Sequence, residues 1–117
     1  MNEESCVRVY IASPYTLGDP HENVRAAMTT WHALRDLGYS PYCPLLSHFL
    51  HLHRERAYED WLAFDLEWLG LCAVCLRMPG ESTGADREVA WCETQHIPVA
   101  YSVGDLVAMF PPKRGKP

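Results

Sequence analysis

A glycine-bearing turn between a buried strand and a helix constrains the fold of this chain more than any other stretch. The apolar run Cys72–Leu76 predicts a buried strand, and the segment that ends at Gln95 predicts a helix. In an open α/β sheet, ligands bind where a strand gives way to a helix. Gly80 and Gly84 let the backbone turn tightly, while Ser82 offers a hydroxyl and the helix start offers unpaired N–H groups. The turn therefore predicts a site for a polar or anionic group.

Glu88 lies about one helical turn beyond Gly84, so its carboxylate can point back over this turn. That placement favours chemistry at the site. In the simpler interpretation, Glu88 is only a first-turn acid favoured by the helix dipole, and Ser82 or Thr83 is only an N-cap.

Length and charge restrict the class of protein. A chain of 117 residues predicts one domain over 1–117, with a frayed tail over 111–117. The net charge of −5 argues against binding to a nucleic acid polymer, which requires a basic face. No apolar run approaches the ~20 residues of a membrane span, and the acidic start does not resemble a signal peptide. We therefore expect a soluble, cytoplasmic protein without membrane contact.

The five cysteines are expected to be reduced core thiols, because the count is odd and several lie in apolar runs. Cys72 and Cys75 have the spacing of a redox or zinc pair. Strand alternation would place them on opposite faces, and no second pair supplies further ligands. The sequence thus predicts neither a metal nor a cofactor.

The remaining segments alternate between strand and helix patterns. Apolar runs predict strands at 6–12, 39–43 and 97–101, and helical spacing predicts helices at 20–37, 58–69 and 104–110. This order predicts a Rossmann-like or flavodoxin-like α/β domain. We expect a parallel sheet of four or five strands in the order 2-1-3-4, with helices on both faces. The loop 13–20 would then share the ligand-binding edge with the turn after residue 76.

Two further segments carry candidate site residues. The segment 44–54 has no clean period and could be a mobile cover over the site; its His48, His51 and His53 do not share one helical face, which favours surface or substrate-facing roles over a metal site. The helix 58–69 places Asp65 among apolar residues, including Trp61 and Trp68. A carboxylate there is costly unless it is functional or is bonded to a nearby hydroxyl.

Three motifs in this order resemble the nucleoside 2-deoxyribosyltransferase-like superfamily, which includes 2'-deoxynucleoside 5'-phosphate N-hydrolases and short uncharacterised bacterial and phage members. They are residues 9–15, 65–69 and 80–90, and the resemblance covers roughly residues 7–101. It implies an enzyme that cleaves an N-glycosidic bond of a nucleoside or nucleotide, with water or a second base as acceptor. It also implies a homo-oligomer, because a neighbouring subunit completes the site in active members.

The resemblance assigns roles to individual residues. Glu88 matches the nucleophilic glutamate, Asp65 the aspartate that handles the proton of the leaving base, and Tyr10 the tyrosine near the nucleophile. Ser82 and Gly84 match the loop that holds the 5' end. With the Ser13 loop and one histidine, the expected substrate-binding set is Ser13, Pro14, Tyr15, His48, Gly80, Ser82, Thr83 and Gly84.

The residues that differ from the family pattern are ones that bear on recognition of a 5'-phosphate. Pro14 stands where the N-hydrolases usually carry a serine, and Asp86 and Arg87 replace more neutral residues. Pro79 and Gly80 also resemble part of the signature of phosphoribohydrolases that release cytokinin bases, but the second glycine and the spacing differ.

The chemistry of the residues agrees with the resemblance. Cleavage passes through an oxocarbenium-like state that one carboxylate can trap while a second acid manages the leaving-group proton. We expect Glu88 to stay ionised near the helix start and Asp65 to have a raised pKa. A nucleotide-binding module without turnover is the alternative from a different class.

Overall fold

Four parallel strands form one sheet in the order β2-β1-β3-β4 in the computed structural model, which describes residues 6–15 and 17–112. β1 and β3 are neighbours in the sheet, with Val9 opposite Val74 and Ala12 opposite Arg77. The predicted order is therefore confirmed. The strands are β1 (Arg8–Ala12), β2 (Ser40–Tyr42), β3 (Val74–Arg77) and β4 (Val99–Ala100).

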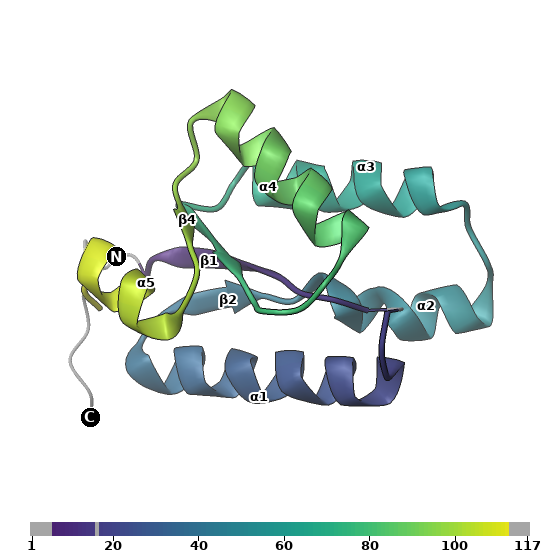
Figure 1. Cartoon of the computed structure of the whole chain (residues 1–117), viewed down its shortest axis with the longest axis horizontal. Coiled ribbons are helices and arrows are strands. Elements are labelled where there is room, and N and C mark those ends of the chain that lie inside the picture. Colours follow the sequence, from purple (N-terminus) through teal and green to yellow (C-terminus); the bar gives the residue numbers. More distant parts are fainter. Residues whose placement is uncertain (1–5, 16, 113–117) are drawn as a thin grey trace.

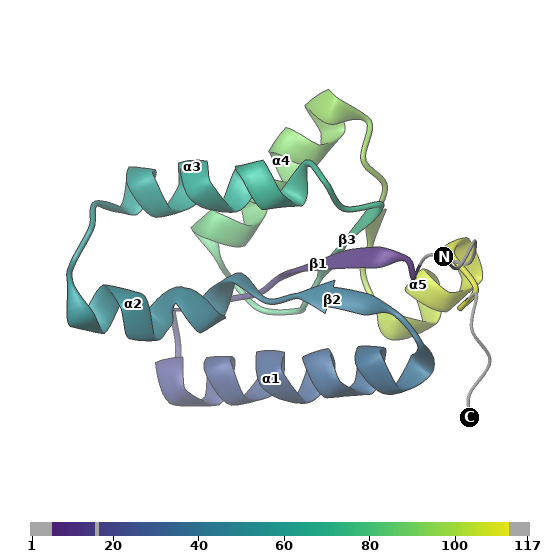
Figure 2. The ribbon, with the colours of Figure 1, turned by 180° about the vertical axis from the view of Figure 1, so that it is seen from behind.

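Helices cover both faces of the sheet, as predicted (Figure 1). The helices are α1 (Pro20–Leu37), α2 (His48–His53), α3 (Tyr58–Leu69), α4 (Thr83–Gln95) and α5 (Val103–Met109), and the 3-10 turn η1 (Pro44–Ser47) precedes α2. Figures 1 and 2 both place α2 beyond the carboxyl ends of the strands, at the end of the molecule opposite α5.

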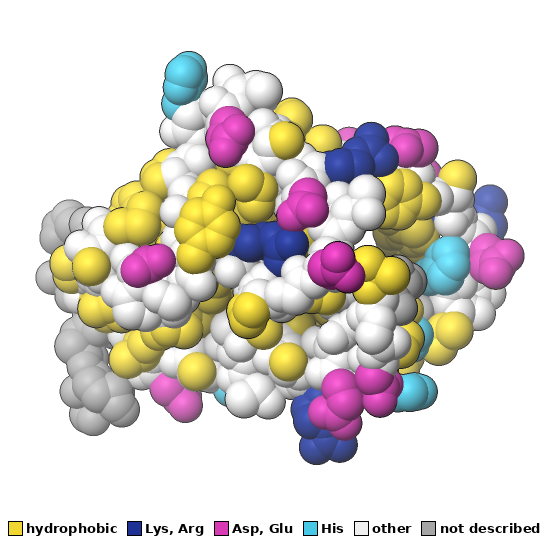
Figure 3. Space-filling model, viewed as in Figure 1, with side chains coloured by type: hydrophobic (Ala, Val, Ile, Leu, Met, Phe, Trp, Pro, Cys, Tyr) yellow, Lys and Arg dark blue, Asp and Glu magenta, His cyan; other side chains and the backbone are white. Residues whose placement is uncertain are grey.

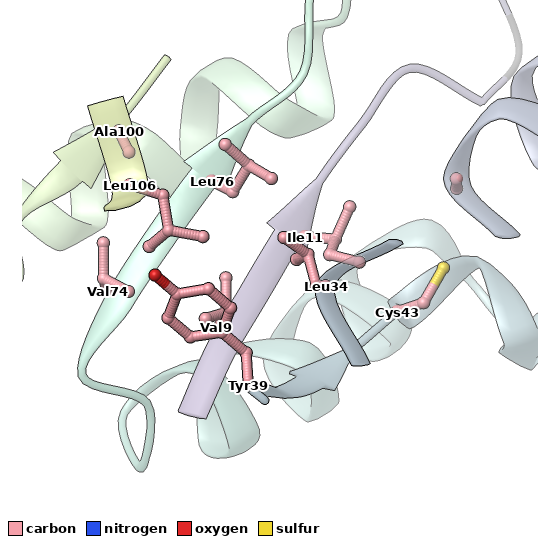
Figure 4. Packing of buried hydrophobic residues seen from close by; sticks show 10 residues of the cluster. Val9, Ile11, Leu34, Tyr39, Cys43, Val74, Leu76, Ala100 and Leu106 are labelled. Carbon is pink, nitrogen blue, oxygen red and sulfur yellow. The ribbon is translucent and has the colours of Figure 1, made fainter. Parts of the chain in front are cut away.

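Alternation along β1 divides the core into two layers. Val9 and Ile11 face the layer that α1 and α5 cover, while Tyr10 and Ala12 face the layer that α3 and α4 cover. Figure 4 shows the first layer, including the ring of Tyr39. The hydroxyl of Tyr39 donates to the carbonyl of Phe110 at 2.6 Å. Burial on both faces explains why β1 and β3 are short, nearly continuous apolar runs.

Local signals set the bounds of the main helices. The side chain of Asp19 accepts from the amides of His21 and Glu22, and Gly38 ends α1 in the left-handed conformation at φ 105°. The Ser82 hydroxyl oxygen accepts from the amide of Ala85 at 3.0 Å and so caps α4. Asp19 and Ser82 have the short polar side chains that are typical of helix N-caps.

The structure corrects two details of the sequence analysis. Cys72 lies in the turn before β3 and packs on the same layer as Cys75, because strand alternation does not extend into a turn. Trp68 is 45% exposed and stacks on Tyr42 instead of joining the buried face of α3.

Other expectations have simpler outcomes. All five cysteines are free thiols. Within the described ranges, no helix combines the length and the apolar character that a membrane crossing needs. Residues 111 and 112 lie outside any helix or strand, and the rest of the expected tail, like Thr16 of the loop 13–20, lies outside the described residues.

Candidate active site

The loops that follow β1 and β3 meet at the carboxyl edge of the sheet. Gly80 has φ +115°, and a Cβ added there would lie 2.8 Å from Cγ of Pro14. Only glycine combines this conformation with so close an approach. The amide of Met78 also donates to the carbonyl of Ala12 at 2.8 Å. Pro14 and Gly80 therefore hold the two loops together and do not line the cleft beside them.

A cleft of about 750 Å³ opens beside these loops. Its walls come from the β1 loop, the 44–56 segment, α3 and the start of α4. Of the expected site residues, it is lined by Ser13, Tyr15, His48, Asp65, Ser82, Thr83, Gly84 and Glu88. Segments distant in the sequence are thus brought to one cavity, whose volume suits a small molecule.

Glu88 is a buried acid of α4, only 6% exposed. The hydroxyl of Tyr10 donates to its Oε2 at 2.5 Å from the fully buried centre of β1. Burial raises the pKa of Glu88 to about 7, and the negative charge of Asp65 adds to the rise, while the Tyr10 hydrogen bond and Arg77 oppose it. Burial, with the Glu88 charge next in importance, strongly raises the pKa of the Tyr10 hydroxyl, so Tyr10 stays protonated and remains a donor.

The expected ionisation of Glu88 needs correction. α4 begins at Thr83, so Glu88 lies in the second turn, and the acid of the first turn is Asp86. The helix dipole acts mainly within the first turn, whereas burial acts on Glu88 directly. A pKa near neutrality means that both the acid and the carboxylate are populated at pH 7.

Asp65 faces the same cleft from α3. Burial raises its pKa to about 7, as the sequence analysis expected. Its Oδ1 is shielded from solvent and has no hydrogen-bond partner in the described part of the chain. Among the described residues, this oxygen is therefore not bonded to a nearby hydroxyl, so such a bond does not explain the burial of Oδ1. An unpartnered buried polar atom in a cleft is typical of a binding or catalytic position.

Ser13 presents a second unpartnered polar atom. Its side chain is 8% exposed, and its Oγ has no hydrogen-bond partner among residues 6–15 and 17–112. Nearby in the cleft wall, the Tyr15 hydroxyl and Nδ1 of His48 form a hydrogen bond that joins the β1 loop to α2. Because Ser82 uses its oxygen as an acceptor for the α4 cap, its O–H remains available to a ligand.

Asp86 and Arg87, the charged residues just before Glu88, each form an ion pair with another side chain. Nη2 of Arg77 lies 2.8 Å from Oδ1 of Asp86. Arg87 binds both carboxylate oxygens of Glu59, at 2.9 and 3.2 Å, and its guanidinium carbon lies 5.4 Å from the centre of the Tyr58 ring. On the face in Figure 3, the dark blue groups lie beside magenta ones. The Arg87 contacts fasten the start of α3 to the start of α4, and the Arg77–Asp86 pair joins the end of β3 to α4.

Several cleft-lining residues were not named among the expected catalytic and substrate-binding residues, although some belong to the segment 44–54 that was expected to cover the site. These are Leu17, Pro44, Leu45, Ser47, His51, Glu55, Arg56, Tyr58, Trp61, Leu62 and Ala85. The Tyr58–Trp61 turn could have been anticipated, because it lies one helical turn before Asp65 on the same helix. Within the described residues, no group of three or more histidines, cysteines or acids is placed to hold a metal ion.

Comparison with known families assigns the chain to a family. Residues 7–102 match the model of a family described as a domain of unknown function, DUF7768. The chain belongs to the DUF7768 family. No curated protein matches this DUF7768 member.

One solved structure has a similar fold. It is a 2-deoxyribosyltransferase from the psychrotolerant bacterium Bacillus psychrosaccharolyticus, with 22% sequence identity and a TM-score of 0.60. The match covers 80% of this DUF7768 chain and 69% of that chain. At this identity the likeness supports a common fold, and the chemistry has to be argued from the cleft itself.

Proposed function

We propose that this protein cleaves the N-glycosidic bond of a nucleoside, with Glu88 as nucleophile and Asp65 as the acid that protonates the leaving base. The observation that carries the proposal is that these two carboxyl groups, from different helices, line one cleft and both have a pKa of about 7. Two acids poised near neutrality can divide the roles of nucleophile and proton donor. The similar fold of a 2-deoxyribosyltransferase supports the same reaction class.

The first step can be written from the contacts of Glu88. Tyr10 binds Oε2, whereas the other carboxylate oxygen, Oε1, has no hydrogen-bond partner in the described part of the chain and can attack the anomeric carbon. The new C–O bond forms as the C–N bond breaks, and the electrons of that bond go to the base. The proton of Asp65 neutralises the departing nitrogen. Water or a second base then displaces Glu88 and returns the proton to Asp65.

The charges around the cleft favour a nucleoside over a nucleoside 5'-monophosphate. The lining includes the acids Glu55, Asp65 and Glu88, while its one arginine, Arg56, lies 3.0 Å from Asp60. A phosphate dianion would meet acids and an already paired arginine, whereas a 5'-hydroxyl could bond to Ser13 or Ser82.

We also propose that the protein is a homo-oligomer. Phe49, Leu50 and Leu52 of α2 are each more than 60% exposed, and α2 has no buried residue. A helix with this much exposed apolar surface beside the cleft is suited to a contact with a second copy. Light scattering coupled to gel filtration should give a mass above the 13.3 kDa of one chain.

The reaction is tested by product analysis. The purified protein is incubated with deoxynucleosides, ribonucleosides and their 5'-monophosphates, each with and without a free base, and the products are separated by chromatography. A free base without exchange indicates a hydrolase, and a new nucleoside indicates a transferase. Binding of one member without turnover of any favours a nucleotide-binding module. Glu93→Gln, an exposed acid of the same helix, serves as the matched control for Glu88→Gln.

A further inference from the structure

His51 of α2 lines the cleft, and its ring is held by groups that can only donate hydrogen bonds. Nε1 of Trp61 donates to Nδ1 of His51 at 2.8 Å, and the backbone amide of Arg56 donates to the same atom at 3.3 Å. The rings of His51 and Trp61 meet edge to face, with centroids 5.9 Å apart at 67°. Three contacts thus fix both the position and the orientation of the imidazole.

These contacts assign the proton of the neutral ring. Neither an indole N–H nor a backbone N–H can accept a hydrogen bond, so Nδ1 of His51 is the unprotonated nitrogen and Nε2 carries the hydrogen. His48 differs in this respect, because its partner is the hydroxyl of Tyr15, which can donate or accept. His51 is therefore the cleft histidine with a defined tautomer.

His51 and Asp65 line the same cleft, and Trp61, which donates to the His51 ring, is on the same helix as Asp65. Trp61 and Asp65 are four residues apart on α3, which places them on one face of the helix, and both line the cleft. In the described part of the chain, Nε2 of His51 forms no hydrogen bond, whereas Nδ1 receives two. The His51 ring thus keeps one donor, Nε2–H, for a ligand in the cleft that Asp65 also lines.

We propose that His51 is a specificity-determining residue that donates its Nε2–H to an acceptor on the base, and that Trp61 is the positioning residue that sets this tautomer. The acceptor is a carbonyl oxygen or an unprotonated ring nitrogen of a heterocycle. The nature of this ligand rests on the proposed function. An N–H donor next to three cleft acids suits an uncharged acceptor better than a phosphate oxygen, which the acids would repel.

The tautomer is tested directly by the ring ¹⁵N shifts of the protein. His51 should show Nε2–H in the neutral form. In Trp61→Phe, which keeps an aromatic ring but removes the indole donor, the share of the Nδ1–H tautomer should rise, because only the longer contact from the Arg56 amide then remains. A neutral His51 that carries its proton on Nδ1 in the unaltered protein would overturn the assignment.

The role in recognition is tested by binding of the four deoxynucleosides, in a Glu88→Gln background so that turnover does not interfere. Loss of one hydrogen bond should weaken the best binder about fivefold to tenfold in His51→Phe. His51→Gln, whose amide can donate near the position of Nε2, should recover most of the affinity. His53→Phe is the matched control, because His53 is an exposed histidine of α2 that does not line the cleft.

The outcomes separate this inference from the proposed function. Unchanged affinity in His51→Phe, or failure of His51→Gln to recover it, overturns the role of His51. Competition by inorganic phosphate that depends on His51 shows a phosphate oxygen as the acceptor and also overturns it. If binding depends on His51 but the unaltered protein releases no base, only the proposed reaction fails. If no deoxynucleoside binds, both fail.

Discussion

The hydroxyl of Tyr10 and Oε2 of Glu88 lie 2.5 Å apart, across 78 residues of sequence. Tyr10 is on the central strand β1 and Glu88 is on α4, so this contact ties the carboxyl group to the most deeply buried part of the sheet. Among the described residues, it is also the one neutral interaction that holds the pKa of Glu88 down against burial, as Arg77 acts through its charge. The contact therefore links the sheet to the reactivity of the proposed nucleophile.

Tyr10→Phe should raise the pKa of Glu88 and reduce the carboxylate fraction at neutral pH. Because a hydrogen bond to an ionised group contributes roughly 1.5–3 kcal/mol, the rising limb of the pH dependence of kcat/KM should move up by about one to two units. Activity at pH 7 should fall about tenfold as a result. Tyr42→Phe is the control, since its ring packs on Tyr10 without a hydrogen bond to Glu88. An unshifted limb in Tyr10→Phe would contradict this role.

Asp65→Asn should change both limbs of the pH profile. The like charge of Asp65 raises the pKa of Glu88, so its removal should move the rising limb to lower pH, and loss of the acid should abolish the falling limb. The loss of rate should be larger for a poor leaving base than for a good one, because a good leaving base departs without full protonation. Profiles measured for one substrate of each kind check this, and a persistent falling limb would show that another group donates the proton.

Burial of Glu88 should make stability depend on pH. Its pKa is about 7 in the folded protein against 4.5 as the ordinary value, so the folded state binds more protons between those values. The free energy of unfolding should therefore fall as pH rises through this window, by about 2 to 3 kcal/mol from this group. Urea unfolding at pH 5 and pH 8 should show a smaller decrease for Glu88→Gln. An equal decrease in both proteins would argue against a buried, protonated Glu88.

Gly80→Ala should separate the two loops of the site and destabilise the protein. The positive φ and the 2.8 Å approach to Pro14 together predict a loss of roughly 1–3 kcal/mol in unfolding free energy. Gly104→Ala is the matched control, because Gly104 lies in α5 and an added Cβ there meets its nearest atom, Oγ of Ser102, at 3.7 Å. Thermal unfolding of the two variants should differ clearly, and equal stability would show that the loop contact matters little.

The sequence predicted the elements well where local signals agree. The bounds of α3 follow directly from its apolar pattern, and those of α1 follow from Asp19, Pro20 and Gly38. The start of α4 was less clear, because Ser82, Thr83 and Gly84 are all compatible with a helix start. Glu88 was expected near the helix N-terminus, where the dipole favours the carboxylate, but it lies in the second turn, where burial dominates its ionisation.

Local sequence patterns could not predict the parts of the site that depend on contacts between distant segments. The order of strands implied that the β1 and β3 loops meet, but the packing of Pro14 on Gly80 follows from backbone positions that no periodicity encodes. The hold of Trp61 on His51 is of the same kind, since each residue alone resembles an ordinary helix position. Tertiary contacts, rather than propensities, set these details.

The most direct test of the account compares base release by the unaltered protein and by Glu88→Gln. The substrate is the nucleoside that the unaltered protein turns over best, measured by chromatography of the free base. Glutamine keeps the shape of glutamate and can still accept from Tyr10, but it is not a competent nucleophile, so the rate should fall by at least about a thousandfold. Glu93→Gln should keep the unaltered rate. A Glu88→Gln protein that releases base as fast as the unaltered protein would contradict the proposed role of Glu88.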